Sequence, residues 1–300
     1  LADPARLAPY QVVVLPNSAA LSEAQAVALQ RYVEGGGGLV ASFETGRYDV
    51  NGTRRETPLL AGLLGAASGE PVAQSTWSMP LTGVEHPVVD HPEFRGSGLC
   101  VQGASDPTPS GVLYQGPADR PIGAAPVSDV AEGAIVLPLA GQGAPAKSRF
   151  ATALLRPVGQ GRVAFLPLDL GHLYYVFNHP LARRLMGRAC TWAAGSEPTL
   201  RTDAPLCCQT VLYQQGDAAV VHLLNDTSSF GRAAAPNPEA YGAFKAEVLP
   251  LHGVTVSVRG AFSRAQWLPD GTTLPVTQAD GRSTVTVPRV EIHGVVVFQP

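Results

Sequence analysis

The sequence predicts an α/β domain followed by an antiparallel β-sandwich. In the N-terminal part, two apolar strands enclose an amphipathic helix, and this βαβ order builds a parallel sheet with flanking helices. Beyond residue 197 the hydrophobic pattern changes from a helical period of about 3.6 to alternation, which is typical of half-buried strands. A chain of 300 residues, 45% of them hydrophobic, is long enough for two cores. We therefore predict domains at residues 1–196 and 197–300.

Local signals mark the first βαβ unit. An apolar strand at residues 10–17 precedes a helix for which Ser22 is the predicted N-cap, and Gln25 completes a capping box. Four glycines at residues 35–38 end this helix and lead into a second apolar strand, which runs into Ser42. The two strands are expected to lie parallel in one sheet.

The middle of the chain is less regular. Residues 66–150 are rich in Gly, Pro, Ala and Ser, which predicts short strands and long loops. A turn and a buried strand follow at residues 159–167, and a helix is predicted over residues 179–194, with Gly195 as its C-cap. The segment that contains Tyr174 and Tyr175 is expected to be a loop just past a strand end.

The second domain reads as a series of short strands. Apolar and polar residues alternate at residues 254–259 and 283–288, and Asp-Gly pairs at residues 270–271 and 280–281 indicate turns. A long surface loop is predicted at residues 230–238. Further strands are expected at residues 210–214, 218–225, 266–268 and 291–298. Several short strands with turns between them predict a sandwich.

Composition argues against several classes of function. The net charge is −3 and the only lysines are Lys147 and Lys245, so no phosphate-binding surface and no nucleic-acid partner are expected. No stretch approaches the roughly 20 apolar residues of a membrane helix. We expect a cytoplasmic protein, with secretion left open, and we expect the chain to be the C-terminal part of a longer polypeptide. Free thiols are predicted at Cys100, Cys190, Cys207 and Cys208.

A family resemblance rests on several sequence blocks in a fixed order. The chain resembles the class I glutamine amidotransferase-like domain called the β-galactosidase trimerisation domain, followed by the small β-sandwich found behind it in β-galactosidase-like glycoside hydrolases. The resemblance implies an amidotransferase/flavodoxin-like parallel sheet in the first domain. The blocks that carry it are residues 10–17, the helix from Ser22, 35–46 with Tyr48 and Asp49, 161–169 with Tyr174, 191–195, 221–225 and 264–271.

This resemblance implies a noncatalytic accessory and oligomerisation region. In such proteins two catalytic carboxylates lie in a (β/α) barrel, which would precede this chain in the same polypeptide. The resemblance also implies a homo-oligomer, a trimer by analogy, and no cofactor. We therefore predict no catalytic residue in these 300 residues.

The most informative position is the end of the second strand. Amidotransferases of this fold place a cysteine nucleophile on an elbow between small residues, because a thiolate must attack the substrate. Here the run Ser42, Glu44, Gly46 has the elbow pattern, and Glu44 stands where the cysteine is expected. A carboxylate cannot form the thioester, so Glu44 and Gly46 mark an elbow without a nucleophile.

Other residues provide the alternatives. Glu44, Asp49 and Asp169 follow predicted strands, and paired carboxylates suit glycoside hydrolysis, so a stand-alone hydrolase using Glu44 and Asp169 is one alternative. A carbohydrate-binding module is another, because exposed aromatic rings stack on sugars. The possible ligand or interface residues are Tyr48, Asp49, Asp169, Tyr174, Tyr175 and Trp267.

No metal site is predicted. The pairs Asp169 with His172 and His86 with Asp90-His91 have short spacings but no evident third ligand, and a zinc site usually takes three or four protein ligands. His222 alternates with apolar residues along a strand and is expected to be a hydrogen-bonded sheet histidine.

Overall fold

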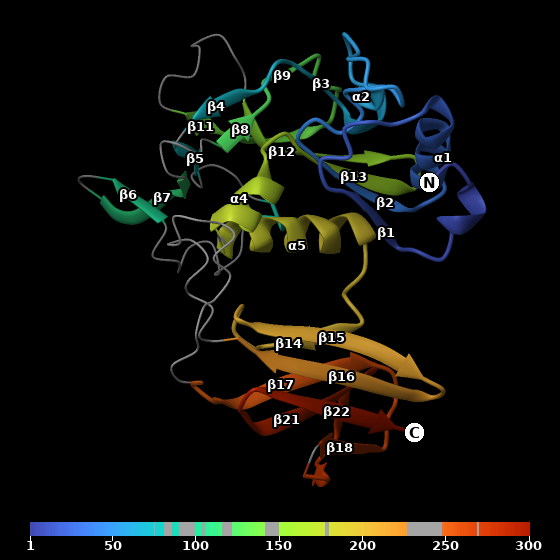
Figure 1. Ribbon diagram of the computed structural model, residues 1–300, viewed down its shortest axis with the longest axis vertical. Helices are drawn as coiled ribbons and strands as arrows, with labels where there is room; N and C mark the ends of the chain where they lie inside the picture. Colours follow the sequence, from blue (N-terminus) through green and yellow to red (C-terminus); the bar gives the residue numbers. More distant parts are fainter. Residues whose placement is uncertain are drawn as a thin grey trace. The chain divides into compact units, whose positions relative to one another are not determined.

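The computed structural model describes residues 1–74, 76–80, 86–89, 100–103, 106–115, 122–141, 150–177, 180–226, 248–268 and 270–300 (Figure 1). These residues form two compact units, Leu1–Glu197 and Pro198–Pro300, and each unit has its own hydrophobic core. The predicted loop at residues 230–238 and the Asp90-His91 pair lie outside the described residues.

A mixed five-stranded sheet forms the centre of unit 1, in the order β1-β2-β13-β12-β10. Strands β1, β2 and β13 are parallel, whereas β12 and β10 are antiparallel to their neighbours. The predicted parallel sheet is therefore correct for three strands and wrong for two. The bounds are β1 Val12–Leu15, β2 Gly38–Ser42, β13 Gly161–Leu166, β12 Ala151–Val158 and β10 Ile135–Pro138.

Helices cover both faces of this sheet, which makes unit 1 an α/β structure (Figure 1). Alternate residues of β2 point to opposite faces. Leu39 joins the core that contains α1 and α2, and Val40 joins the core that contains α4 and α5. The predicted capping box of Ser22 and Gln25 begins α1. The helices are α1 Glu23–Glu34, α2 Ala61–Leu64, α4 Leu170–Phe177 and α5 Pro180–Ala194, with a short 3-10 helix at Pro4–Arg6.

Gly38, the last glycine of the four-residue run, allows α5 to approach the sheet closely. A Cβ atom at Gly38 would lie 2.4 Å from the carbonyl oxygen of Ala193, near the end of α5. This is far below a normal contact distance, and backbone atoms cannot move aside as a side chain can. The glycine run thus both ends α1 and keeps space for a helix on the opposite face.

Mostly short strands occupy the irregular middle of the chain, as predicted, but β7 has ten residues. They form the pairs β3-β9 and β4-β8 and a sheet in the order β11-β5-β7-β6. Their bounds are β3 Ala67–Ser68, β4 Val72–Gln74, β5 Thr76–Pro80, β6 Cys100–Gly103, β7 Asp106–Gln115, β8 Ile122–Ala124, β9 Val127–Ser128 and β11 Ala140–Gly141.

Unit 2 is a sandwich of two antiparallel sheets around one core. Val256 and Val285 come from the first sheet and Val221 and Val296 from the second, and all four are buried in the same cluster. The first sheet is β14 Leu200–Thr202, β17 Leu251–Arg259, β21 Arg282–Val290 and β20 Thr277–Ala279. The second is β15 Cys208–Gln215, β16 Ala218–Asn225, β22 His293–Gln299, β18 Arg264–Leu268 and β19 Thr272–Leu274.

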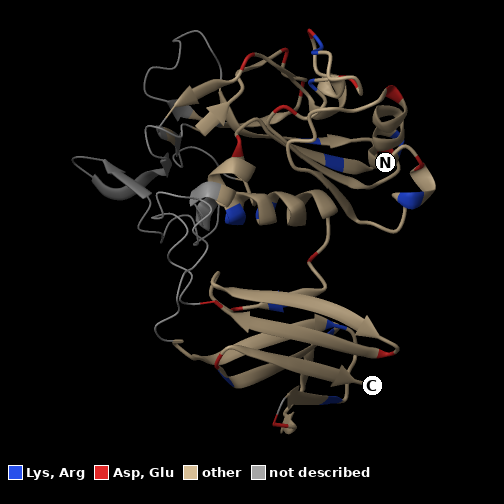
Figure 2. Cartoon of the chain, in the orientation of Figure 1, with Lys and Arg blue, Asp and Glu red and all other residues tan. Residues whose placement is uncertain are grey.

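Charged residues of both signs are interspersed along the two units (Figure 2). In the part of the chain that the structure describes, no helix is long and apolar enough to cross a membrane.

Two buried polar side chains hold unit 2 together. Arg282 donates to the carbonyl oxygens of Pro198 and Thr199 at 3.0 and 2.9 Å, so β21 fixes the first residues of the unit. Asn225 Nδ2 donates to the carbonyl oxygens of Leu249 and Glu291, both at 2.7 Å. Because Asn225 is almost fully buried, its side-chain amide needs hydrogen-bond acceptors within the protein, and these two oxygens serve as acceptors.

Replacing Asn225 with aspartate should destabilise unit 2 by about 2–4 kcal/mol. The isosteric carboxylate cannot donate, and it would face the carbonyl oxygens that the amide now satisfies. The measurement is thermal unfolding of the full chain, followed by calorimetry. Gln209→Glu is the matched control, since it makes the same chemical change at an exposed position of β15. Equal stability losses for the two variants would contradict the assigned role of Asn225.

Candidate functional site at the carboxyl edge of the sheet

The three parallel strands of unit 1 end side by side. Leu15 pairs with Ala41, and Leu166 pairs with Ser42, so the loops after β1, β2 and β13 begin at one edge of the sheet. Glu44 follows β2 and Asp169 follows β13, as the sequence suggests. Open α/β sheets bind ligands at this edge, which makes it the candidate functional site.

The residue with a strained backbone at the end of β2 is Phe43, which directly precedes Glu44. Phe43 has a φ of 50°, in the left-handed region that a bulky side chain adopts only under strain. Its amide donates to the carbonyl oxygen of Leu166 at 2.9 Å, and its ring is buried against Gly123, where a Cβ atom would lie 2.7 Å from Phe43 Cζ. The strained position thus lies one residue before Glu44, and the sequence pattern does not reveal the sign of φ.

Hydrogen bonds connect this elbow to the end of β1. Asn17, which also has a positive φ of 49°, donates its amide hydrogen to Ser42 Oγ at 3.0 Å. The amide of Glu44 donates to Asn17 Oδ1 at 3.3 Å. Gly46 has a φ of 78°, and its amide donates to the carbonyl oxygen of Ser18 at 3.0 Å. Glu44 thus contributes its backbone to a cross-linked turn, and Gly46 supplies the conformation the turn needs.

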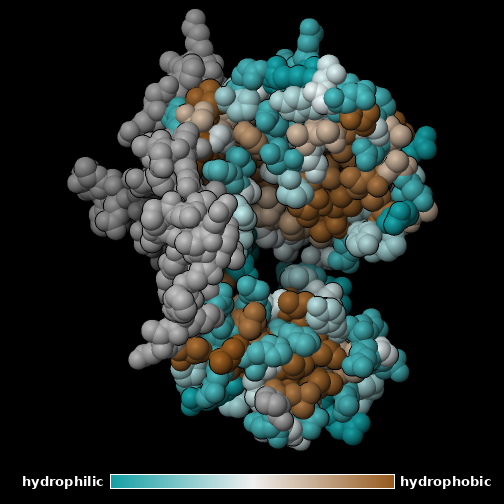
Figure 3. All heavy atoms as spheres, viewed as in Figure 1, coloured by the Kyte–Doolittle hydropathy of each residue, from teal (hydrophilic) through white to brown (hydrophobic). Residues whose placement is uncertain are grey.

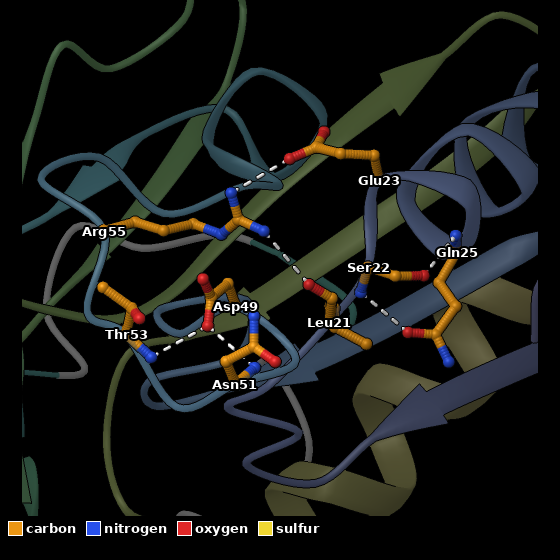
Figure 4. Close-up of polar contacts among 8 residues, drawn as sticks. All are labelled: Leu21, Ser22, Glu23, Gln25, Asp49, Asn51, Thr53 and Arg55. Carbon is orange, nitrogen blue, oxygen red and sulfur yellow. Dashed lines mark hydrogen bonds and ion pairs between the residues drawn. The ribbon is translucent and has the colours of Figure 1, made fainter.

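Asp49 organises its own loop (Figure 4). Its Oδ1 atom accepts hydrogen bonds from the amides of Asn51 and Thr53, both at 2.8 Å. These bonds, chiefly the one from Thr53, hold the pKa of Asp49 below its usual value. The backbone amide of the adjacent Tyr48 donates a hydrogen bond to the carbonyl oxygen of Ala19 at 2.9 Å. Both residues thus serve in the conformation of the loop.

Arg55 joins the same loop to the start of α1. It donates to Glu23 Oε1 at 2.9 Å and to the carbonyl oxygen of Leu21 at 3.2 Å (Figure 4). These contacts lie next to the capping box of Ser22 and Gln25. The loop after β2 is therefore fixed to the helix that follows β1.

Asp169 is the N-terminal cap of α4. Its Oδ1 atom accepts a hydrogen bond from the amide of His172 at 3.2 Å, and its own amide donates to the carbonyl oxygen of Gly123 at 2.9 Å. Burial raises the pKa of the Asp169 carboxyl, with smaller opposing contributions from His172. The Asp169 carboxyl thus caps α4 through its hydrogen bond to His172 and is shielded from water by burial.

Tyr174 and Tyr175 lie in α4, whereas the sequence predicted a loop. The helix begins directly after Asp169, because that side chain caps it and the following apolar residues pack on the sheet. The side chain of Tyr174 is 40% exposed and that of Tyr175 is 70% exposed. Both side chains can therefore contact a partner or a ligand, and the helix holds their backbone in a fixed conformation.

Trp267 is a core residue and not a surface ring. It is 6% exposed and lies over Gly294, where a Cβ atom would come within 2.1 Å of the indole ring. Its predicted availability for sugar stacking is therefore wrong. The register of β18 against β22 turns this side chain inward, and a single strand sequence does not give that register.

Metal ligands do not gather at this edge. Over the described ranges, no group of three or more His, Cys, Asp and Glu residues could hold an ion. His86 Nδ1 accepts a hydrogen bond from the amide of Val88 at 3.2 Å, and its ring packs edge-on against Trp192. Cys190, Cys207 and Cys208 form no disulfide bond, and burial raises the pKa of the Cys190 thiol.

Asp169→Asn should leave the chain as stable as the parent, or more stable, at pH 7. Asparagine is an equally good cap and carries no charge to desolvate. The pKa of Asp169 is higher in the folded chain than in the unfolded chain, where it is about 3.9. Asp169 therefore contributes fully to the free energy of unfolding below the unfolded pKa, and this contribution is lost as the pH rises through the folded pKa. The stability difference should therefore be small at pH 3.5 and should grow toward pH 7, as measured by urea unfolding.

Asp169→Ala is the control for the cap itself: it removes the cap as well as the carboxylate, so it should be about 1 kcal/mol less stable than Asp169→Asn at either pH. If Asp169→Asn instead loses stability as the pH rises, the carboxylate has a cationic partner and the assignment of a desolvated cap is wrong.

Comparisons with known proteins find one family model that matches part of the chain. Residues 2–80 match the family model described as the β-galactosidase trimerisation domain. No curated protein sequence matches the chain.

Solved structures resemble nearly the whole chain in fold. The α-L-fucosidase isoenzyme 2 from Paenibacillus thiaminolyticus has a TM-score of 0.65 at 17% identity, over 98% of this chain and 41% of that one. The β-galactosidase from Bacillus circulans sp. alkalophilus has a TM-score of 0.55 at 16% identity, over 97% and 33%. Gan42B, a GH42 β-galactosidase from G. stearothermophilus, has a TM-score of 0.56 at 12% identity, over 97% and 32%.

The chain thus spans about a third to two fifths of the length of these structures. The resemblance predicted from the sequence is confirmed: residues 2–80 match the β-galactosidase trimerisation domain family, and the fold around them is one found in β-galactosidases and an α-L-fucosidase.

Proposed function

We propose that this chain is a noncatalytic accessory region of a β-galactosidase-like glycoside hydrolase and that its first domain mediates self-association. The domains are residues 1–196, an amidotransferase/flavodoxin-like α/β domain, and residues 197–300, a β-sandwich. The match of residues 2–80 to a trimerisation domain supports this role. A catalytic (β/α) barrel upstream in the same polypeptide would carry the hydrolytic carboxylates.

One observation carries the noncatalytic part of the proposal. The strained elbow at the end of β2 is present, with Phe43 at a φ of 50°, but its side chain is an apolar ring buried against Gly123. A nucleophilic elbow exposes a reactive atom at this point. In this chain the packed ring of Phe43 lies where a nucleophilic side chain would be exposed.

The exposed aromatic residues of α4 are the proposed contact surface. Tyr174 and Tyr175 present large, amphipathic side chains at low entropic cost, as interface residues commonly do. Other large hydrophobic side chains reach the surface of both units as well (Figure 3). Cys190, Cys207 and Cys208 form no disulfide bond, which fits a cytoplasmic location, and we keep this location as part of the proposal.

Self-association should be visible by sedimentation equilibrium of the full chain over a wide concentration range, with a trimer as the expected species. Tyr175→Ser should weaken association about tenfold or more by removing an exposed ring from the contact. Tyr213→Ser is the control, since Tyr213 is a 58% exposed tyrosine in unit 2. A monomer at every concentration, both for this chain and for its complete polypeptide, would reject the assembly role.

A stand-alone hydrolase is the alternative, and the raised pKa of Asp169 is the observation that favours it, because a general acid needs such a shift. It predicts that the chain hydrolyses nitrophenyl glycosides and that Glu44→Gln and Asp169→Asn each abolish turnover. Our proposal predicts no turnover above buffer for the parent chain. Turnover that is lost in both variants would establish the alternative.

A further inference from the structure

A pair of histidines lies on the outer face of the second sheet of unit 2. His222 belongs to β16 and His293 begins β22. His222 Nδ1 lies 3.1 Å from His293 Nε2, and the two rings are nearly parallel, with centroids 5.3 Å apart. Neither residue takes part in the strand-end site of unit 1 or in the proposed assembly.

The strand register explains why the two rings meet. Leu224 pairs with His293 and His222 pairs with Val295, so these four side chains share one face of the sheet. Residues 221 and 223 point the other way, into the core. His222 is half-buried and His293 is exposed, so the shared nitrogens are accessible from solvent.

A third side chain restricts the movement of the pair. The ring of Tyr213, on the neighbouring strand β15, meets His222 edge-on with centroids 5.4 Å apart. His222 therefore lies between Tyr213 on one side and His293 on the other. Less rotational freedom is lost when such a pair binds a ligand than when two unrestrained surface histidines do.

The geometry points to a binding site for one divalent transition-metal ion, held by His222 Nδ1 and His293 Nε2. Metal–nitrogen bonds of about 2.0–2.1 Å in a tetrahedral site place two imidazole nitrogens about 3.3 Å apart. The observed 3.1 Å separation is close to this value. To bind an ion between the two nitrogens, the rings must turn so that both lone pairs point at it.

The ligand set defines the class of ion. Neutral imidazoles suit Cu²⁺, Ni²⁺ and Zn²⁺, with Cu²⁺ binding most strongly. Within the described portion of the molecule no group of three or more His, Cys, Asp and Glu residues surrounds an ion, so water completes the coordination. The site is thus open and exchangeable, unlike a closed structural zinc site.

The competing interpretation is a hydrogen-bonded pair with no ligand. In that case one ring donates its N–H to the other, and metal binding would require the loss of this hydrogen bond and transfer of the proton to the other nitrogen of the donating ring. The two interpretations therefore differ in whether the parent chain binds a metal ion at these two nitrogens.

Isothermal titration of the full chain with NiCl₂ tests the proposal, because Ni²⁺ favours imidazole over carboxylate ligands. We expect one ion bound per chain and release by EDTA. His222→Ala and His293→Ala should each weaken binding about tenfold or more, because each removes one of two protein ligands. His252→Ala, at an exposed histidine of β17, and Cys207→Ser, at a free thiol, should leave binding unchanged.

A measurement on the parent chain avoids any dependence on the folding of the variants. In NMR spectra of the imidazole nitrogens, diamagnetic Zn²⁺ should shift the ring signals of His222 and His293 together and leave that of His252 in place. Absence of saturable binding, or binding that is equal in the parent and in both histidine variants, would overturn the site. So would a zinc-induced shift confined to other histidines.

Discussion

The structure of unit 1 depends on the complete burial of β2. All five residues from Gly38 to Ser42 are inaccessible to solvent, so every backbone hydrogen-bonding group of this strand needs a partner within the protein. Parallel pairing with β1 on one side and β13 on the other provides these partners. The same pairing places the ends of three strands at one edge. The position of the candidate site is thus a consequence of the central strand.

Local signals in the sequence were sufficient to predict those elements whose structure depends on residues close together in the chain. The capping box of α1 depends on Ser22 and Gln25, three residues apart, and both bonds are present. The pairing of β10 with β12 could not be derived in this way, because it joins segments separated by a stretch that contains Gly and Pro. Tyr174 and Tyr175 were misplaced for a related reason, since helix α4 starts from a cap made by Asp169 immediately after a strand.

Side-chain direction limited the prediction of the site. The pattern around Ser42 and Gly46 located the elbow to within one residue, but only the backbone dihedral of Phe43 identifies the strained position. In strands, a shift of one position reverses the face, and Trp267 points into the core because Gly294 leaves room for its ring. The pairing of His222 with His293 likewise requires the register of β16 and β22, which their separation in sequence conceals.

The strain at the elbow bears on the stiffness of this edge of the sheet. A residue such as Phe43 in the left-handed region costs about 1–3 kcal/mol, and the cost is tolerated only when the surrounding structure enforces it. The bonds among Asn17, Ser42 and Glu44 and the packing of the ring on Gly123 provide that enforcement. With a reactive side chain, such rigidity positions a nucleophile. With a buried phenylalanine, it stiffens the edge of the sheet, and a stiff edge is what a surface needs in order to bind a partner without losing conformational entropy.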